Sequence, residues 1–308
     1  MNKKYLLETH NLCKTYGEQV ILKDVNMHIE KGKVYGLLGR NGAGKTSLMK
    51  MILGLTSISS GTISAFGKPL NNNSMDSFAR IGSLIEAPGF YPNMTGYENL
   101  KIFSILKGTT RKNAVKDVLD FVNLPYQDKK IFASYSLGMK QRLGLANALM
   151  NEPEFLILDE PTNGLDPIGI AELRKFIQDL TKKHGKTILI SSHQLAEIEQ
   201  LADTIGVLHD SRLIEECDME EVSKQNQKYL AIQVSDVNNA CILIERQLKI
   251  RNYRVVHSNV LHIYDLSQKP NDINRMLLEN DVDVFMLNTF VENLEEHFKS
   301  ITGGVGIA

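Results

Sequence analysis

The sequence has few cysteines and no long apolar run, and both absences narrow the class of protein. Its 308 residues contain only three cysteines, Cys13, Cys217 and Cys241, which lie far apart and lack the spacing of metal ligands. We expect unlinked thiols in a reducing compartment rather than disulfides or a metal site. No apolar run approaches the ~18 residues that a spanning helix needs, and the N-terminal segment lacks a signal-peptide core. We therefore expect a cytoplasmic chain that does not itself cross a membrane.

The sequence also lacks an excess of charge of either sign. Its 35 Lys and Arg residues nearly balance 36 Asp and Glu residues, for a net charge of −1 at pH 7. A basic surface is the usual footprint of nucleic-acid binding, so we expect no nucleic-acid partner, although a local basic patch is compatible with this balance. The chain has no internal repeat, low-complexity stretch or sustained heptad pattern. Its length suits one large domain or two smaller ones.

Short aliphatic runs alternate with helical patterns in the first two-thirds of the chain. The runs are "KVYGLLG" (Lys33–Gly39), "EFLILDEP" (Glu154–Pro161) and "KTILISSH" (Lys186–His193). Continuous apolar runs of this kind indicate buried parallel strands in a wound α/β sheet. Between Phe103 and Met150 the apolar residues recur mostly at helical spacing, which predicts a helical insertion.

The pattern changes after about Ser223 and predicts a second domain. The expected elements, in order, are a strand at 228–236, a helix at 238–250, strands at 253–258 and 259–266, a helix at 269–281 and a strand at 282–288. This βαββαβ order predicts a small α+β, ferredoxin-like domain at residues 223–308. A last helix is expected at 291–301, before a Gly-rich end that we expect to be frayed.

A phosphate-binding motif lies between a predicted strand and a predicted helix. "GRNGAGKT" (Gly39–Thr46) fits G-x-x-x-x-G-K-[ST], in which glycines let consecutive backbone N–H groups point at phosphate oxygens. We expect Lys45 to reach the β- and γ-phosphates and Thr46 to hold Mg²⁺. The alternative is a glycine-rich turn that matches by chance. The expected nucleotide-binding residues here are Gly39, Arg40, Asn41, Gly42, Ala43, Gly44, Lys45, Thr46 and Ser47.

Two carboxylates and a histidine follow predicted strands. Asp159 and Glu160 come directly after "FLIL", at the carboxyl end where ligands bind in wound sheets. We expect Asp159 to hold Mg²⁺, directly or through water, and Glu160 to polarise a water aimed at the γ-phosphate. His193 ends another strand and is a candidate γ-phosphate sensor. The alternatives are a solvated acidic turn and a structural or exposed histidine.

Together these motifs resemble the ATP-binding subunits of ABC transporters. The resemblance rests on the glycine loop, "SYSLGMKQRLGLANAL" (Ser134–Leu149), "ILDEPTNGLDP" (Ile157–Pro167) and "SSH" (Ser191–His193). More narrowly, the chain is similar to bacitracin-resistance and lantibiotic-immunity transporter ATPases. The resemblance implies an ATPase domain at residues 1–222, with its helical subdomain inserted at about 88–150, and an accessory domain at 223–308.

The resemblance also implies two ATP molecules sandwiched between two such domains. Each ATP would contact the glycine loop of one subunit and the signature segment of the other, here "SLGMKQ". Ser136 would donate to the γ-phosphate and Gly138 would allow close backbone approach. Leu137 and Met139 depart from the commonest form, Ser-Gly-Gly-Gln, whereas Ser136 and Gly138 match it, so the resemblance still implies the role of the helix end.

Three further residues match positions of the family. Tyr16 matches the aromatic residue that stacks on adenine, with an ordinary core tyrosine as the alternative. Asp166 matches the dimer-contact aspartate. Glu86 stands where most members carry a glutamine that bridges the Mg²⁺ site to the membrane subunit, and the lantibiotic-immunity group also has glutamate there. A carboxylate suits a hard cation, so we expect Glu86 to act with Mg²⁺; the alternative is a glutamate that faces solvent.

The predicted function is therefore an ATPase that uses ATP and Mg²⁺ to energise a separate transmembrane permease. The resemblance implies that the cargo is an antimicrobial peptide. It also implies that two ATPase subunits work as a dimer, most simply a homodimer, and that the dimer lies at the cytoplasmic face of the cell membrane. One alternative is a soluble ABC ATPase acting on ribosomes or DNA, but such relatives usually have two cassettes or long coiled coils, which this chain lacks. A third is a regulatory role in which the C-terminal domain binds a small effector.

Overall fold

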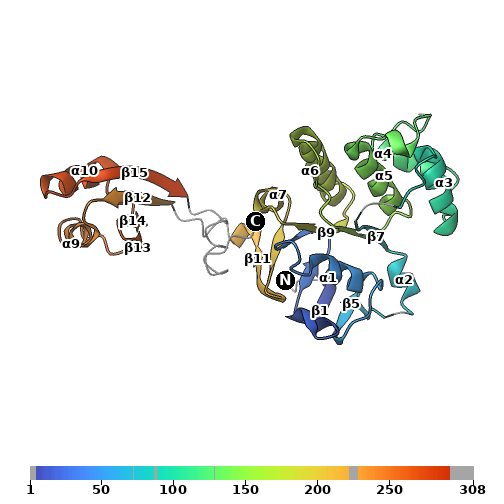
Figure 1. The fold of residues 1–308 in the computed structure, drawn as a ribbon, viewed down its shortest axis with the longest axis horizontal. Helices are drawn as coiled ribbons and strands as arrows, with labels where there is room; N and C mark the ends of the chain where they lie inside the picture. The colour runs from blue at the N-terminus through green and yellow to red at the C-terminus, as the bar shows by residue number, and fades with distance from the viewer. Residues whose placement is uncertain (1–4, 72, 87–88, 128, 222–227, 292–308) are drawn as a thin grey trace. The chain divides into compact units, whose positions relative to one another are not determined.

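The computed structural model describes residues 5–291 apart from 72, 87–88, 128 and 222–227 (Figure 1). The chain divides into two compact units, the first ending at Met219 and the second beginning at Glu220. The domain boundary expected at residue 222, the last helix and the Gly-rich end lie outside the described residues, except for Val291, which ends a strand.

A mostly parallel sheet of six strands forms the centre of the first unit. In spatial order its strands are β11 (Arg212–Asp218), β10 (Thr204–His209), β4 (Val34–Leu38), β9 (Thr187–Ser192), β8 (Phe155–Leu158) and β7 (Ile81–Leu84). All neighbouring pairs are parallel except β10 and β11. Every residue of β4, β8 and β9 is buried, as expected for aliphatic strands covered on both faces. The sequence-based prediction of buried parallel strands is confirmed.

An antiparallel sheet near the N-terminus packs with the central sheet around one helix. Its strands are β1 (Tyr5–Tyr16), β2 (Gln19–Val25), β3 (His28–Glu30), β5 (Ser60–Ala65) and β6 (Lys68–Pro69). Helix α1 (Lys45–Ile52) shares one apolar core with β1, β2, β4 and β5 and lies beside β1 and β5 in Figure 1. This core fixes the start of α1, and with it the glycine loop, against both sheets.

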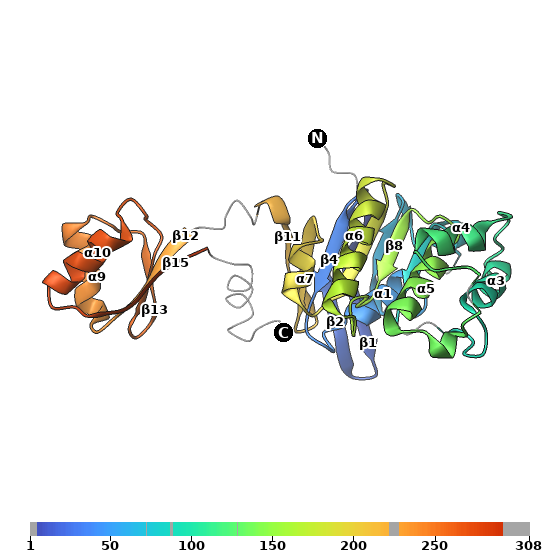
Figure 2. The same ribbon diagram turned by 90° about the horizontal axis from the view of Figure 1, so that it is seen from above.

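The remaining helices of the first unit include a group of three. The elements are α2 (Met75–Phe78), α3 (Gly96–Leu106), α4 (Ala114–Phe121), a 3-10 turn (Phe132–Ser134), α5 (Leu137–Leu149), α6 (Pro167–Lys182) and α7 (Leu195–Glu199). Helices α3, α4 and α5 pack against one another in the stretch where helical spacing is seen in the sequence (Figures 1 and 2). Thr95 begins α3 with a capping box that includes Glu98.

The aromatic residues after Glu86 divide between the interior and the surface. Phe90 is buried, with its ring centroid 5.3 Å from that of Phe103 and 5.2 Å from that of Phe132. Tyr91 and Tyr97 are exposed. This loop therefore packs into the domain through Phe90 and presents Tyr91 and Tyr97 at the surface.

The second unit is a four-stranded antiparallel sheet with two helices. Its elements are β12 (Lys228–Val234), α9 (Val237–Gln247), β13 (Tyr253–His257), β14 (Val260–Ile263), α10 (Pro270–Glu279) and β15 (Val284–Val291). The strand order is β13-β14-β12-β15. Alternate strand residues such as Leu230 and Leu261 form a core with Ile244 of α9 and Leu277 of α10. Because the members of this core all belong to the second unit, that unit has an apolar interior of its own.

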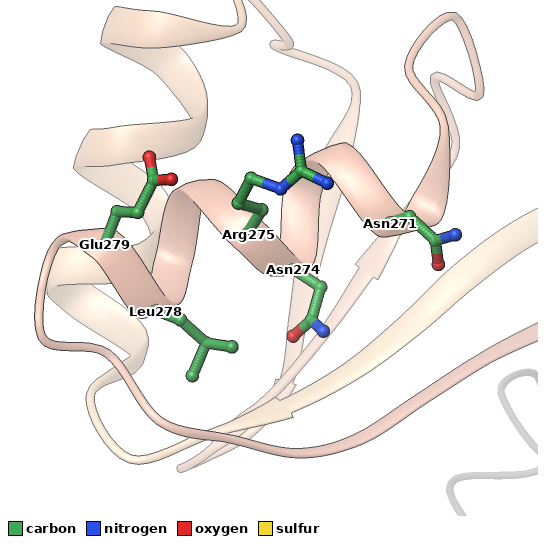
Figure 3. A pocket seen from close by; sticks show the side chains of 5 residues that line it. All are labelled: Asn271, Asn274, Arg275, Leu278 and Glu279. Carbon is green, nitrogen blue, oxygen red and sulfur yellow. The ribbon is translucent and has the colours of Figure 1, made fainter.

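A shallow hollow lies on α10, on the side away from that core. Figure 3 shows the five side chains that line it: Asn271, Asn274, Arg275, Leu278 and Glu279. The side chains that α10 buries are different ones, Ile273, Met276 and Leu277. Across both units, no helix in the described part of the chain has the length and apolar content that crossing a membrane requires.

Candidate nucleotide-binding and hydrolytic site

The glycine loop connects β4 to α1, and two of its glycines are required by backbone geometry. Gly42 and Gly44 have φ angles of 84° and 105°, in the region that glycine adopts without a steric penalty. A Cβ on Gly44 would also lie 2.8 Å from Leu22 Cδ2 and 3.1 Å from the Ile21 carbonyl oxygen, on β2. Gly44 is therefore needed both for the turn and for close packing against β2.

The start of α1 opens onto a pocket of about 200 Å³. No side chain caps the first-turn N–H groups of α1, and this turn contains no acidic residue. Uncapped N–H groups and the positive end of the helix dipole together suit an anion. The residues that line the pocket are Ile21, Arg40, Asn41, Gly42, Gly44, Lys45, Thr46, Ser47 and Glu160.

Lys45 crosses the loop and pairs with a carboxylate from another strand. Its Nζ donates to the carbonyl oxygens of Gly39 at 2.5 Å and Arg40 at 3.2 Å, and lies 3.0 Å from Glu160 Oε1. The Lys45 side chain is only 5% exposed. A buried ammonium is costly unless it is hydrogen-bonded and paired, and these three oxygens meet that requirement.

Asp159 accepts a hydrogen bond on each of its two carboxylate oxygens. Thr46 Oγ1 donates to Oδ2 and Ser191 Oγ donates to Oδ1, both at 2.7 Å. The structure thus brings together Thr46 and Asp159, which stand 113 residues apart in the sequence. A hydroxyl and a carboxylate are hard oxygen ligands of the kind that Mg²⁺ prefers.

Glu160 is held by three side chains from three segments. Its Oε2 lies 2.6 Å from His193 Nδ1 and 2.9 Å from Asn163 Nδ2, and Lys45 contacts the other oxygen. Burial would raise the pKa of Glu160, but the hydrogen bonds from Lys45 and His193 outweigh it and hold the pKa below its ordinary value. The carboxylate is therefore ionised at neutral pH. Since an ionised carboxylate only accepts hydrogen bonds, Nδ1 of His193 carries the proton.

Glu86 follows β7 and pairs with a lysine of α1. Its Oε1 accepts a hydrogen bond from Lys50 Nζ at 2.7 Å, and this bond raises the pKa of Lys50. The Glu86 side chain is 64% exposed, and its backbone is left-handed with φ 57°. Glu86 therefore faces solvent while it is paired with Lys50.

The described residues do not form a ready-made metal site around Glu86. Among them, no group of three or more His, Cys, Asp or Glu side chains is arranged to hold a metal ion. The structure does not gather Glu86 with Asp159 into such a group.

Tyr16 lies at the end of β1 with half of its surface exposed. Its hydroxyl is 3.2 Å from Thr56 Oγ1, and Lys14 Nζ is 4.4 Å from the centre of its ring. The alternative of an ordinary core tyrosine is wrong for this residue. An exposed, oriented ring is compatible with stacking on a planar ligand.

The residues of the signature segment lie at a separate helix end. Ser136 is the exposed N-cap of α5, where its side chain accepts a hydrogen bond from the Met139 backbone N–H at 3.3 Å. Asp166 is the exposed N-cap of α6 and accepts from the Gly169 backbone N–H at 2.7 Å. A Cβ on Gly138 would meet no close atom of this subunit, so packing within the subunit does not require glycine at this position. None of Ser136, Gly138 and Asp166 lines the pocket at α1.

Three side chains that contact the site residues are absent from the sequence-based prediction. Ser191 binds Asp159 and also accepts from the Glu160 backbone N–H at 2.8 Å, and strand alternation places it on the same face as His193. That alternation in "SSH" is a signal that would have identified Ser191. The bonds from Asn163 to Glu160 and from Lys50 to Glu86 have no comparable signal in the sequence.

The fold and the glycine loop define the class as a P-loop nucleotide-binding protein. Residues 22–163 match the family model described as ABC transporter. The chain is 48% identical to the bacitracin transport ATP-binding protein BcrA of Enterococcus faecalis, in an alignment that covers all of both chains. It is 47% identical over 209 residues, 68% of this chain and 89% of the relative, to the lantibiotic transport ATP-binding protein SrtF of Streptococcus pyogenes.

Solved structures agree with this assignment. Among them is cbiO1 from Clostridium perfringens, described as part of the ABC transporter complex cbiONQ, with a TM-score of 0.65 and 26% identity over 80% of this chain and 98% of that one. The chain therefore belongs to the ABC transporter family. It is an ATP-binding protein of that family and an ATPase.

Proposed function

We propose that this chain hydrolyses ATP to energise a separate membrane permease that exports an antimicrobial peptide of the bacitracin or lantibiotic type. The observation that carries the proposal is identity of 48% along the entire chain to a bacitracin transport ATP-binding protein, including the second unit. The described residues contain no helix suited to crossing a membrane, so the path for the peptide belongs to another chain, which would hold this one at the cytoplasmic face. The relatives are transport proteins, which disfavours action on ribosomes or DNA.

Co-expression in a sensitive bacterium tests this function. The chain and the permease encoded beside its gene would be expressed together and singly, and resistance to bacitracin and to a lantibiotic measured. We expect resistance only when both are present, and its loss when Glu160 is replaced by Gln in the ATPase. A chain that sediments with ribosomes and gives no resistance with any neighbouring permease would support the soluble alternative instead.

The contacts around the pocket support an assignment of roles in the nucleotide site. The N–H groups at the start of α1 and the Lys45 ammonium bind the phosphates, and Tyr16 stacks on adenine. Thr46 and Asp159 have the oxygen donors that suit Mg²⁺, which when bound neutralises phosphate charge. Glu160 orients and polarises the attacking water, and His193 holds Glu160 through Nδ1 and senses the γ-phosphate.

The second nucleotide contact comes from another copy of the chain. Ser136 and Gly138 lie at an exposed helix end, and Asp166 begins another helix in an exposed position. In a homodimer the N-terminus of α5 in one subunit faces the nucleotide bound to the other subunit. The Ser136 oxygen accepts a hydrogen bond from the Met139 backbone N–H, so the Ser136 hydroxyl proton remains available to donate to the γ-phosphate. Asp166 contacts the facing subunit in the same arrangement.

Glu86 acts as a Mg²⁺-coupled residue whose charge is balanced by Lys50 until nucleotide binds. Glu86→Gln removes the carboxylate, so nucleotide binding should need a higher Mg²⁺ concentration. Lys50→Met removes the cation that pairs with Glu86, so nucleotide binding should need a lower Mg²⁺ concentration. An exposed pair contributes ~0–1 kcal/mol, so each shift should be at most about fivefold. The measurement is a Mg²⁺ titration at fixed fluorescent ATP analogue, followed by resistance of cells to the peptide. Superimposable curves and unchanged resistance would make Glu86 a bystander.

The βαββαβ order of the second unit and its strand order support a ferredoxin-like assignment, and we assign this unit to subunit association or regulation. A chain ending at Met219 should bind ATP within about twofold of the full chain, a free-energy change of roughly 0.4 kcal/mol. The reason is that the pocket is lined only by the first unit, and each unit has its own core. Equilibrium binding of an ATP analogue tests this. Loss of binding in a shortened chain that remains folded by circular dichroism would contradict it.

A further inference from the structure

Two adjacent serines at the end of β9 make contacts on opposite sides of the strand. Ser191 bonds to Asp159 and to the Glu160 backbone, within the hydrolytic site. Ser192 is 2% exposed and donates to Glu197 Oε2 at 3.0 Å. Successive side chains of a strand point to opposite faces, so the end of β9 links the catalytic carboxylates on one face to Glu197 on the other.

Glu197 is a buried carboxylate that has no part in the site as described above. It lies on α7 and is 7% exposed. Its Oε2 accepts from Ser192 and also from Thr162 Oγ1 at 2.6 Å, and Thr162 itself is buried. Within the described ranges, no Lys, Arg or His side chain forms an ion pair with it. A buried carboxylate is costly unless hydrogen-bonded, so the two hydroxyl groups are what hold Glu197 in place.

The acceptor-only character of this carboxylate sets the direction of the surrounding hydrogen bonds. Both hydroxyl groups must donate to Glu197, which leaves the Ser192 oxygen to accept from the Gln194 backbone N–H at 2.9 Å. Ser192 and Gln194 are the two neighbours of His193 in the chain. Glu197 thereby fixes the backbone on both sides of His193, while Thr162 anchors the turn that follows Glu160.

We propose that Glu197 is a positioning residue for ATP hydrolysis. Through Thr162 and Ser192 it holds together the turn after β8 and the turn after β9, and so keeps His193 at 2.6 Å from Glu160. The proposal rests on the roles proposed above for Glu160 and His193. The pairing of β8 with β9 sets the register of the strands, and Ser191 connects the two turns on one face. Glu197 supplies the connection on the other face, through Thr162 and Ser192.

The test is Glu197→Gln in the full chain, with steady-state ATPase and equilibrium binding of a fluorescent ATP analogue. Both hydroxyl groups donate to Oε2, so Gln can keep an oxygen there, but these bonds lose the negative charge that strengthens them and an NH₂ replaces the second oxygen. The two turns are then held less firmly. A displaced catalytic group costs on the order of 10- to 100-fold in rate. We expect kcat to fall by that factor, while nucleotide Kd and the thermal midpoint stay unchanged. Ser192→Ala should lower kcat less, because Thr162 still holds the carboxylate.

A double variant shows whether Glu197 acts through the histidine. In a His193→Ala background, Glu197→Gln should reduce kcat no further. The same reduction in both backgrounds, or wild-type kcat in both Glu197→Gln and Ser192→Ala, would overturn the proposal. Near-normal kcat in His193→Ala alone would instead refute the proposed role of His193. Glu279→Gln on α10, an identical change at an exposed carboxylate (Figure 3), is the matched control and should leave kcat and Kd unchanged.

Discussion

Glu160→Gln should bind ATP and hydrolyse it roughly 10²- to 10⁴-fold more slowly than the wild-type chain, which is the range that a positioned base or polarising group supplies. Gln has the shape of Glu and keeps an oxygen that can accept from His193 and Asn163. The loss is therefore one of charge rather than of space. Because the pKa of Glu160 lies below its ordinary value, this carboxylate is a weak proton acceptor that acts mainly by orienting and polarising water.

The two measurements are single-turnover hydrolysis and the fraction of dimer in size-exclusion chromatography with ATP and Mg²⁺. Slow hydrolysis should trap the ATP-bound pair, so the variant should elute as a dimer with ATP and as a monomer without it. Glu279→Gln is again the matched control. Steady-state ATPase near the wild-type value in Glu160→Gln would remove this residue from the hydrolytic role.

The parts of the site that can be predicted from sequence are those encoded within a short stretch. The aliphatic runs that became β4, β8 and β9 are continuous and end next to polar residues, so both the strands and the side chains that follow them are visible locally. Spacing within the glycine loop likewise predicts the turn into α1, since the left-handed φ angle at Gly44 is one that other residues rarely adopt.

Contacts that join distant segments leave no such local pattern. Lys50 and Glu86 stand 36 residues apart, and no spacing rule connects a helix lysine with a glutamate after a strand. The left-handed backbone at Glu86 and Glu160 is equally hidden, because neither residue type favours that conformation. The N-terminal antiparallel sheet is hidden in the sequence for another reason: the pairings of β1 with its neighbours contain register shifts, which break the period-two pattern of a strand.

Lys45→Ala should weaken ATP binding by at least about tenfold, because a hydrogen bond to a charged group contributes about 1.5–3 kcal/mol and each 1.4 kcal/mol is a factor of ten. The substitution has a second consequence in this structure. Lys45 is the cation 3.0 Å from Glu160 Oε1, so its removal leaves a half-buried carboxylate that repels phosphate. Lys183→Ala, at an exposed pair with Asp179, is the matched control.

The double variant Lys45→Ala with Glu160→Gln separates these two effects. If Lys45 contacts the phosphates, removing the Glu160 charge restores only part of the lost affinity, and the double variant still binds ATP well below wild type. Equilibrium binding of a fluorescent ATP analogue to the single and double variants measures this, with thermal unfolding to show that both are folded. Wild-type affinity in the double variant would mean that Lys45 only neutralises Glu160. ATP binding by Lys45→Ala alone within about twofold of wild type, or roughly 0.4 kcal/mol, would contradict the assignment of the glycine loop as the phosphate site.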